Sequence, residues 1–521
     1  MSRIRRSRLL PLAAVSLLAT GALTACGGQD SGSGGERLRV AMAFPPAQGM
    51  SPYGDDAVTL SRLSVIEGLT RLDSKGEVKP ALATSWKPSD GGKEWTFTLR
   101  EARFQDGDPV NADAVVRSLE EAEKASPKPR VLSDAGDLKA EAEGARKVRV
   151  TSSEPDALLP QRLANPSLAV LSAGAYGAAD TSEGGKGAKG SGSSEKGGRV
   201  DPAGHATGPF TLTRLNGTAS ATLERNGTYW GDKAEAPGVD VKFVSDGTAR
   251  ANALRGGQTD IAEYVPVSQA SVLDEKQVHE VPTARTNSLY LNTERGVFKD
   301  AGMRATVREA VDSKALIKGV YEGRADTPRG LFGPGVSWAQ DKRVKVSGRA
   351  DAAPEKDVKA TKTITLATYT NRPELPEVAT VLQQQLRKAG FKVKQDVRDY
   401  AQMEADALSG KYDAFLQARN TLLDTGDPVS YLQSDFTCDG SFNISQLCDG
   451  SVDSAVRKAA GTADTEKRQH AEMRAEARVL GTDAVVPLLH ERFVQGVADG
   501  VEGVSFDPME RTLVTADTRR G

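Results

Sequence analysis

Hydrophobic and polar positions follow two different rhythms along the first quarter of this chain. The run LRVAMAF, from Leu38, is short and apolar, and the residues of EWTFTLR, 94–100, alternate between apolar and polar side chains. Both patterns are typical of β-strands. Between these strands, apolar residues recur every third position over 58–69, which predicts a helix. A second helix is predicted over 111–125, because Asn111 supplies a capping side chain and acidic residues follow it.

The same alternation continues toward the carboxyl end. We expect strands over 210–215, 221–226, 239–244, 287–293, 363–369 and 391–397, and helices over 246–256, 303–321 and 374–390. Strands that alternate with helices in this way indicate a mixed α/β fold.

One stretch does not fit this order. Residues 177–200 are rich in glycine, serine and lysine and poor in apolar side chains. Such a composition buries too little apolar surface to offset the entropy that is lost on ordering. We therefore predict a disordered insertion over 177–200.

The amino terminus has the pattern of an export signal. Four arginines between positions 3 and 8 precede an apolar stretch, Leu9–Leu23, which is too short to span a hydrocarbon core of roughly 30 Å comfortably. The last leucine of this stretch and the three residues after it, Leu-Thr-Ala-Cys at 23–26, resemble the lipobox of bacterial lipoproteins. That resemblance implies diacylglycerol on the sulfur of Cys26 and cleavage just before it. We expect residues 1–25 to be a signal peptide and residues 26–37 a flexible tether.

Composition limits the possible partners. The 521 residues are 38% hydrophobic and 26% charged, and the formal net charge is −2. A chain with this balance can form a large core and lacks the strongly basic character of nucleic-acid-binding proteins. We therefore expect no nucleic-acid partner, and membrane contact only through the lipid anchor.

Cysteines and histidines give little support for a metal site. The four histidines lie far apart, and no pair of them or of the cysteines has the close spacing of zinc ligands. Cys438 and Cys448 flank a polar loop, which in an exported chain favours a disulfide. We expect no metal bound by the protein alone and no cofactor.

Motifs for catalysis are also missing from the sequence. It has no nucleophile elbow, no HExxH pair and no glycine-rich phosphate loop between a strand and a helix. We therefore expect that the protein is not an enzyme.

An ordered series of segments resembles a known family. The segment 65–119, which begins VIEGLTRLDSKG and includes DGGKEWTFTLREARFQDGDPVNADAV, is followed by ATGPFTLTRL at 206–215 and LERNGTYWG at 223–231. Together they resemble the large solute-binding proteins of bacterial ABC importers, the peptide/nickel family. The resemblance extends from about residue 38 to residue 510.

The resemblance implies a two-lobe, type II periplasmic-binding-protein-like fold (cluster C) with an extra N-terminal domain. The chain would cross between the lobes at 285–291 and return near 486–491, and the lobes would close on a ligand. We expect lobe I over 38–58, 206–284 and 490–521, the extra domain over 59–205, and lobe II over 285–489.

The family pattern also suggests ligand contacts. Asp424, three positions before the pair Asp427-Pro428, occupies the place of the acid that accepts a peptide ammonium in dipeptide-type relatives, although it could instead cap the turn. Arg372 is the nearest substitute for the arginine that binds the ligand carboxylate. The tryptophan expected shortly before the acid is missing from ARNTLLD. Wall residues could come from Tyr431, Trp338, Phe44 and Met50, each of which would also suit an ordinary core.

The function implied is that of a monomeric lipoprotein on the outer face of the cytoplasmic membrane. It would capture a small peptide between its lobes and deliver it to an ABC permease. Residues 331–340, LFGPGVSWAQ, resemble the nickel branch of the family, so a nickel or other metal-chelate ligand is the alternative. A ligand-sensing lipoprotein with the same fold is a further alternative.

Overall fold

The computed structural model describes residues 36–126, 128–133, 137–176, 200–422 and 424–521. The signal peptide, Cys26 and the tether up to residue 35 lie outside the described residues, as does the expected insertion except for Val200.

A large mixed sheet organises most of the structure. Its strands lie in the order β15-β14-β16-β12-β17-β11-β1-β10-β9-β8, with β13 beside β17. The bounds are β1 (Leu38–Met42), β8 (Phe210–Asn216), β9 (Ser220–Arg225), β10 (Gly238–Phe243), β11 (Ile261–Val265), β12 (Val278–Leu291), β13 (Ala325–Asp326), β14 (Ile364–Tyr369), β15 (Val393–Arg398), β16 (Ala414–Asn420) and β17 (Val485–Val497).

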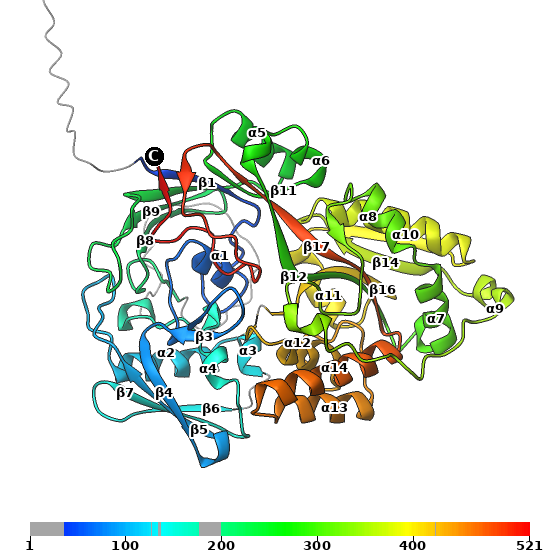
Figure 1. Ribbon diagram of the computed structural model, residues 1–521, viewed down its shortest axis with the longest axis horizontal. Helices are drawn as coiled ribbons and strands as arrows, with labels where there is room; N and C mark the ends of the chain where they lie inside the picture. Colours follow the sequence, from blue (N-terminus) through cyan, green and yellow to red (C-terminus); the bar gives the residue numbers. More distant parts are fainter. Residues whose placement is uncertain (1–35, 127, 134–136, 177–199, 423) are drawn as a thin grey trace, which may run out of the picture. The chain divides into compact units, whose positions relative to one another are not determined.

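Two long strands occupy the middle of this sheet. β12 and β17 run antiparallel side by side, with Thr286 opposite His490. Figure 1 shows them as the long green and orange strands near the middle of the view. β1 pairs with β10 in parallel on one side, and β14 pairs with β15 in parallel on the other. The two chain segments that we expected to cross between lobes are therefore neighbours in one sheet.

A smaller antiparallel sheet is formed within residues 83–152. Its strands, in the order β4-β5-β7-β6, are β4 (Ala83–Ser89), β5 (Glu94–Leu99), β7 (Lys147–Ser152) and β6 (Leu138–Ala142). Helix α2 (Ala112–Lys124) packs against β6 and β7. The Asn111 side chain accepts a hydrogen bond from the Ala114 N–H at 2.9 Å, so the predicted cap and helix are confirmed.

The other helices and strands surround these sheets. They are α1 (Asp56–Arg62), β2 (Thr70–Leu72), β3 (Val78–Pro80), α3 (Arg130–Ser133), α4 (Leu159–Arg162), α5 (Gly247–Arg255), α6 (Val267–Ala270), α7 (Ala301–Ala310), α8 (Ser313–Gly319), α9 (Glu355–Ala360), α10 (Glu374–Lys388), α11 (Glu404–Leu408), α12 (Pro428–Phe436), α13 (Gly450–Ala460), α14 (Thr465–Gly481), β18 (Val501–Glu502) and β19 (Arg519–Arg520). α12, α13 and α14 pack together (Figure 1).

Two helix predictions were wrong in extent. The helix expected over 58–69 ends at Arg62, because Ser64 has a positive φ of 53° and its hydroxyl donates to the Val514 carbonyl at 2.6 Å. The helix expected over 303–321 is two helices, α7 and α8. Asp312 separates them, and its carboxylate accepts the Ala315 N–H at 3.1 Å as the cap of α8.

Three groups of buried apolar side chains make up most of the core. The largest lies around β12, β14, β16 and the helices from α7 to α14, the second around β1, β8, β9 and β10, and the third between α2 and the smaller sheet. Among the helices within the described ranges, none is long and apolar enough to cross a membrane.

Candidate functional site

A pocket of about 580 Å³ opens where several distant segments meet. Its walls come from the first residues of β12, residues 334–338, the tip of the β2–β3 hairpin, and Phe506. Leu422, Gly426 and Pro508 complete the wall, and the first two stand two positions before and after Asp424 in the chain. A volume of this size is typical of sites for small molecules.

The loop before α12 is held from two directions. Asp427 caps α12 by accepting a helix N–H at 3.0 Å. Gly426, with φ of 70°, lies so close to the hairpin that an added Cβ would come within 3.1 Å of the Gly76 carbonyl oxygen. Asn165 Nδ2 donates to the Asp424 carbonyl at 2.9 Å. Asp427 is therefore the cap, and the Asp424 carboxylate is left for other partners.

The Asp424 carboxylate lies among arginines. Arg419 Nη2 is 3.1 Å from Asp424 Oδ2, and the Asp424 side chain is only 12% exposed. Burial opposes ionisation, but the charges of Arg419, Arg130 and Arg511 outweigh it and hold the pKa of Asp424 below its usual value. This carboxylate is therefore ionised, and any ligand cation would have to compete with Arg419 for it.

Arg419 is positioned from behind by a second acid. Its guanidinium donates to Asp435 at 3.0 and 3.1 Å, and both side chains are almost fully buried. The centre of the Phe442 ring is 5.0 Å from the guanidinium carbon. Burial raises the pKa of Asp435, against the charge of Arg419. These contacts fix the guanidinium that faces Asp424.

Arg130, in α3, is a candidate that sequence reasoning missed. Its side chain is 30% exposed, and its guanidinium carbon lies 4.5 Å from the centre of the Phe442 ring. Among the described residues its guanidinium makes no hydrogen bond, and it forms one ion pair, with Asp55 at 3.5 Å. The sequence around it, SPKPR, has no periodicity that could have identified it.

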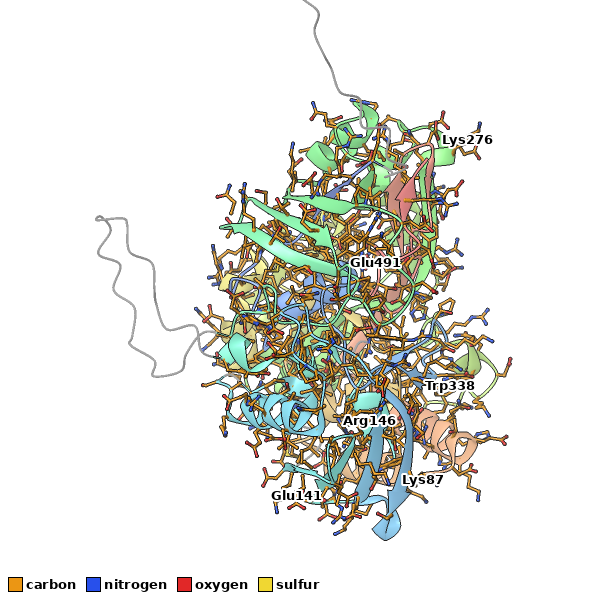
Figure 2. The ribbon with its side chains drawn as sticks, turned by 90° about the vertical axis from the view of Figure 1, so that its left-hand side faces the viewer. Lys87, Glu141, Arg146, Lys276, Trp338 and Glu491 are labelled. Atoms are coloured by element: carbon orange, nitrogen blue, oxygen red, sulfur yellow. A yellow bond between two sulfur atoms is a disulfide. The ribbon has the colours of Figure 1, made fainter. Side chains whose placement is uncertain are left out.

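Arg372 lies in a different environment from Asp424. Its guanidinium is 2.8 Å from Glu491 and 3.3 Å from Glu510, and its side chain is 8% exposed. Glu510 also pairs with Arg285 at 2.8 Å. Figure 2 shows Glu491 in the interior of the view. Two carboxylates therefore already occupy the arginine that we expected to bind the ligand carboxylate.

Tyr431 and Met50 are buried in the core. The Tyr431 hydroxyl is 3.0 Å from that of Tyr290, and the side chain is 2% exposed. Met50 is 1% exposed and packs in the second apolar group, around β1. In this structure neither side chain reaches the 580 Å³ pocket.

Trp338 and Phe44 are both partly buried. Trp338 lines the 580 Å³ pocket, and Figure 2 shows it near the edge of the view. Phe44 packs edge-on against Tyr264, with the ring centres 6.0 Å apart. Of the six expected ligand contacts, the structure places only Trp338 in the pocket wall. Asp424 does not line the pocket, although Leu422 and Gly426, two positions before and after it in the chain, do.

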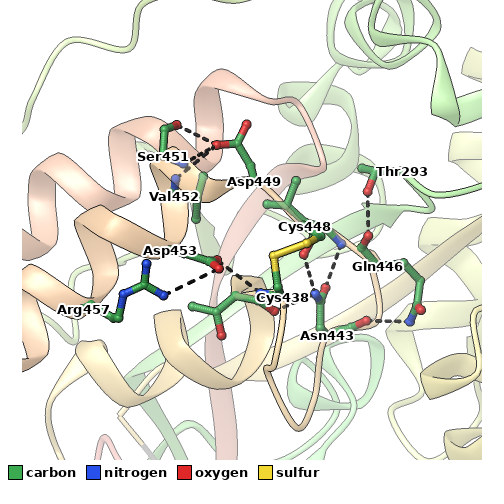
Figure 3. Close-up of a disulfide and its surroundings, with 12 residues drawn as sticks. Thr293, Cys438, Asn443, Gln446, Cys448, Asp449, Ser451, Val452, Asp453 and Arg457 are labelled. Atoms are coloured by element: carbon green, nitrogen blue, oxygen red, sulfur yellow. Dashed lines mark hydrogen bonds and ion pairs between the residues drawn. A yellow bond between two sulfur atoms is a disulfide. The ribbon is translucent and has the colours of Figure 1, made fainter.

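A disulfide joins Cys438 to Cys448 in the loop between α12 and α13 (Figure 3). Phe442, the residue against which Arg130 and Arg419 pack, lies inside this loop and is 1% exposed. Within the described ranges, no group of three or more histidine, cysteine or acidic side chains could hold a metal ion.

Residues 77–443 match the family model for bacterial extracellular solute-binding proteins, family 5, middle part. The chain belongs to this family. The family 5 protein therefore belongs to a class of bacterial extracellular solute-binding proteins.

The relatives of this family 5 protein include peptide-binding and nickel-binding proteins. It is 28% identical over 456 residues to the probable D,D-dipeptide-binding periplasmic protein of Escherichia coli strain K12, covering 85% of each chain. The Helicobacter pylori protein DppA, solved with the peptide STSA, has a TM-score of 0.78 at 22% identity and matches 94% of this chain and 98% of its own.

A second solved structure has the same degree of similarity. It is NikA from Staphylococcus aureus in complex with Ni(L-His)2, with a TM-score of 0.78 at 20% identity over 94% of this chain and 100% of that one. These likenesses confirm the predicted type II periplasmic-binding-protein fold.

Proposed function

We propose that this family 5 protein is an extracytoplasmic solute-binding lipoprotein of an ABC importer, and that it captures a small peptide for a membrane permease. The observation that carries the peptide assignment is the ionised Asp424 carboxylate, which does not line the 580 Å³ pocket but stands two positions along the chain from both Leu422 and Gly426 of its wall. A peptide ammonium is a compact cation with hydrogen-bond donors, which suits a shielded carboxylate. The E. coli relative, named as a dipeptide-binding protein, supports the same ligand class.

We assign the opposite end of the peptide to Arg130 instead of Arg372. Arg372 already contacts two carboxylates. Arg130 retains unused donors and a partly exposed side chain, and its charge acts on Asp424. The ammonium of a short peptide would bind Asp424, and its carboxylate would bind Arg130. Trp338 would supply an apolar wall for a side chain of the ligand.

The remaining parts of the proposal concern the whole chain. The two lobes would close on the peptide by bending in β12 and β17. Lobe I would comprise 38–58, 206–284 and 490–521, lobe II would comprise 285–489, and the extra domain would comprise 59–205. Cys26 would carry the lipid that tethers the protein to the membrane. Solute capture requires no reacting group, so we propose binding without catalysis.

An equimolar dipeptide mixture, with and without N-acetylation, tests the peptide assignment by native mass spectrometry. We expect complexes with free-amine dipeptides, and Asp424→Asn should weaken their binding by about 10- to 150-fold, because a charge-assisted hydrogen bond contributes about 1.5–3 kcal/mol. N-acetylated dipeptides should be affected far less.

Asp427→Asn is the matched control, because it keeps a capping oxygen and lies three positions away in the same loop. It should leave free-amine binding within a few-fold of wild type. Equal losses for free and acetylated peptides in Asp424→Asn would contradict the assignment.

A further inference from the structure

A second pocket, of about 270 Å³, shares no residue with the first. It lies between α7, α8, the segment after β13, the end of α14 and the first residues of β17. The charged residues in its lining are Arg308, Arg329, Arg349 and Asp483. With three arginines and one aspartate, the lining of this pocket has a net positive charge.

Asp483 orients two of these arginines. Its side chain is 3% exposed, and it forms ion pairs with Arg308 and with Arg349, whose Nε lies 3.3 Å from Asp483 Oδ1. Arg349 Nε also donates to the Leu480 carbonyl at 3.1 Å, at the end of α14. These contacts use the inner edge of the Arg349 guanidinium and leave its two terminal nitrogens unused.

The pocket therefore contains donors that the protein itself does not satisfy. Among the residues that the structure describes, neither terminal nitrogen of Arg349 and no guanidinium nitrogen of Arg329 has a hydrogen bond or ion pair. Both side chains are exposed to solvent. Burial lowers the pKa of Arg349. The charge of Asp483 opposes this shift, and the nearby charge of Arg308 adds to it. An anion in the pocket would relieve this repulsion between cations.

We propose that this pocket binds a phosphate group, with Arg329 and Arg349 donating to its oxygens and the Arg308–Asp483 pair behind them. Guanidinium groups bind oxyanions through two parallel hydrogen bonds. Two guanidiniums from separate segments suit a phosphate, whose three or four oxygens can accept from both, better than a carboxylate with two. The volume holds several water molecules, each of roughly 30 Å³, so it can hold a phosphate with part of its hydration.

Two sources could supply this phosphate. Inorganic phosphate is free in solution and mostly doubly charged at neutral pH, whereas the headgroup phosphate of a membrane lipid is a singly charged diester. The probes are therefore inorganic phosphate and monomeric dihexanoylphosphatidylglycerol below its micelle concentration. Titration calorimetry on the purified full chain, at constant ionic strength, measures both.

The test compares two charge-matched double variants. Arg329→Gln/Arg349→Gln removes the unused donors, and Arg214→Gln/Arg295→Gln removes two exposed arginines that do not line the pocket. We expect Kd for the bound probe to rise about tenfold or more in the first variant and to stay within about twofold in the second. The melting temperatures without phosphate verify that both variants fold, and the single variants Arg329→Gln and Arg349→Gln should each show part of the loss.

The outcomes identify the source or reject the site. Binding of inorganic phosphate that depends on Arg329 and Arg349 supports a free-phosphate site, and the same dependence for the diester alone supports a lipid headgroup. No binding of either probe to wild type, or equal binding to all variants, would overturn the proposal. Dipeptide binding should be unchanged in both double variants, which separates this result from the test of Asp424.

Discussion

At the scale of single residues, Arg419 is the side chain on which most of the candidate peptide site depends. It neutralises Asp435, which is fully buried, and it also holds Asp424. Replacing it with methionine leaves the buried Asp435 carboxylate without a cationic partner, with only the Ser434 hydroxyl donating to it at 2.6 Å. We expect Arg419→Met to lower the free energy of unfolding by about 3–5 kcal/mol, measured by urea denaturation.

Two further variants make this prediction specific. Arg419→Met combined with Asp435→Leu removes both charges and should restore most of the lost stability. Arg457→Gln breaks a pair at 3.8 Å in which the arginine is 69% exposed, although its partner Asp453 is buried, and should cost less than about 1 kcal/mol. A double variant as unstable as the single variant would show that packing, and not the unpaired charge, causes the loss.

His490 makes a second residue-scale prediction, for pH. Its Nδ1 is 2.9 Å from the Thr286 hydroxyl, and its Nε2 accepts the Arg329 N–H at 3.1 Å. Burial lowers the pKa of His490 from 6.5 to about 4. The charges of Arg343 and Arg329 also lower it, whereas the charge of Asp326 raises it. The imidazole is therefore neutral in the folded protein at pH values where the unfolded chain protonates it.

The sign of the effect follows from the two pKa values. Between pH 6.5 and about 4 the unfolded chain binds more protons than the folded one, so stability is complete above pH 6.5 and falls as the pH drops. The loss should reach up to about 3 kcal/mol for this residue. Urea denaturation of wild type and His490→Gln from pH 4 to pH 7 should show the steeper decline in wild type. Parallel curves would contradict this assignment.

The residue contacts of the candidate site could be predicted only in part. Asp424 could be proposed as a ligand contact because a local motif, Asp427-Pro428, marks its position in the family pattern. Arg130 could not be found, because its neighbours Phe442 and Asp55 are far away along the chain. For the same reason the sequence did not indicate that Glu491 and Glu510 occupy Arg372. Ion pairs between distant segments are set by the tertiary fold, which local patterns do not encode.

At the scale of elements, the disulfide links the end of α12 to the start of α13 (Figure 3). Cys438 and Cys448 close a short loop that contains Phe442, so the bond restricts the unfolded chain and keeps that ring beside Arg130 and Arg419. Replacing both cysteines with alanine should lower the free energy of unfolding by about 2–3 kcal/mol. Chemical denaturation with and without reductant measures this.

The reductant provides the control for that experiment. Wild type should lose stability in reductant, whereas the double alanine variant should be insensitive to it. Loss of the bond should also raise Kd for free-amine dipeptides, if Phe442 positions the two arginines as we propose. Unchanged dipeptide affinity with lowered stability would limit the disulfide to a structural role.

Elements with strong local signals were predicted well. The strand over 94–100 and the capped helix over 111–125 became β5 and α2, because alternation and an N-cap act within a few residues. The helix over 58–69 was overextended, since its last apolar residues belong to different cores: Ile66 packs with β1, and Leu69 with the smaller sheet. A spacing of three residues alone could not reveal that division.

At the scale of the whole molecule, a small apolar group joins the domain 59–205 to the helices beside the peptide site. Leu158 packs with Val429 of α12, Ala459 of α13 and Ala471 of α14, and Asn165 donates to the Asp424 carbonyl nearby. Both contacts lie between segments that we assign to different sides of the closing molecule. We infer that they favour the closed arrangement before a ligand arrives.

Leu158→Ala tests this inference, because the leucine is 2% exposed and truncating such a side chain costs about 2–5 kcal/mol of packing. If the contact exists only in the closed form, this cost shifts the population toward the open form and raises the apparent Kd for dipeptides. Small-angle X-ray scattering of the ligand-free protein should then give a larger radius of gyration, which returns toward the wild-type value with saturating dipeptide. Leu119→Ala is the control: Leu119 is buried wholly within the core of α2 and the smaller sheet, so the variant should lower the melting temperature without changing the radius. A Leu158→Ala protein with a lower melting temperature and an unchanged radius would show that this group stabilises the fold in both forms and does not govern closure.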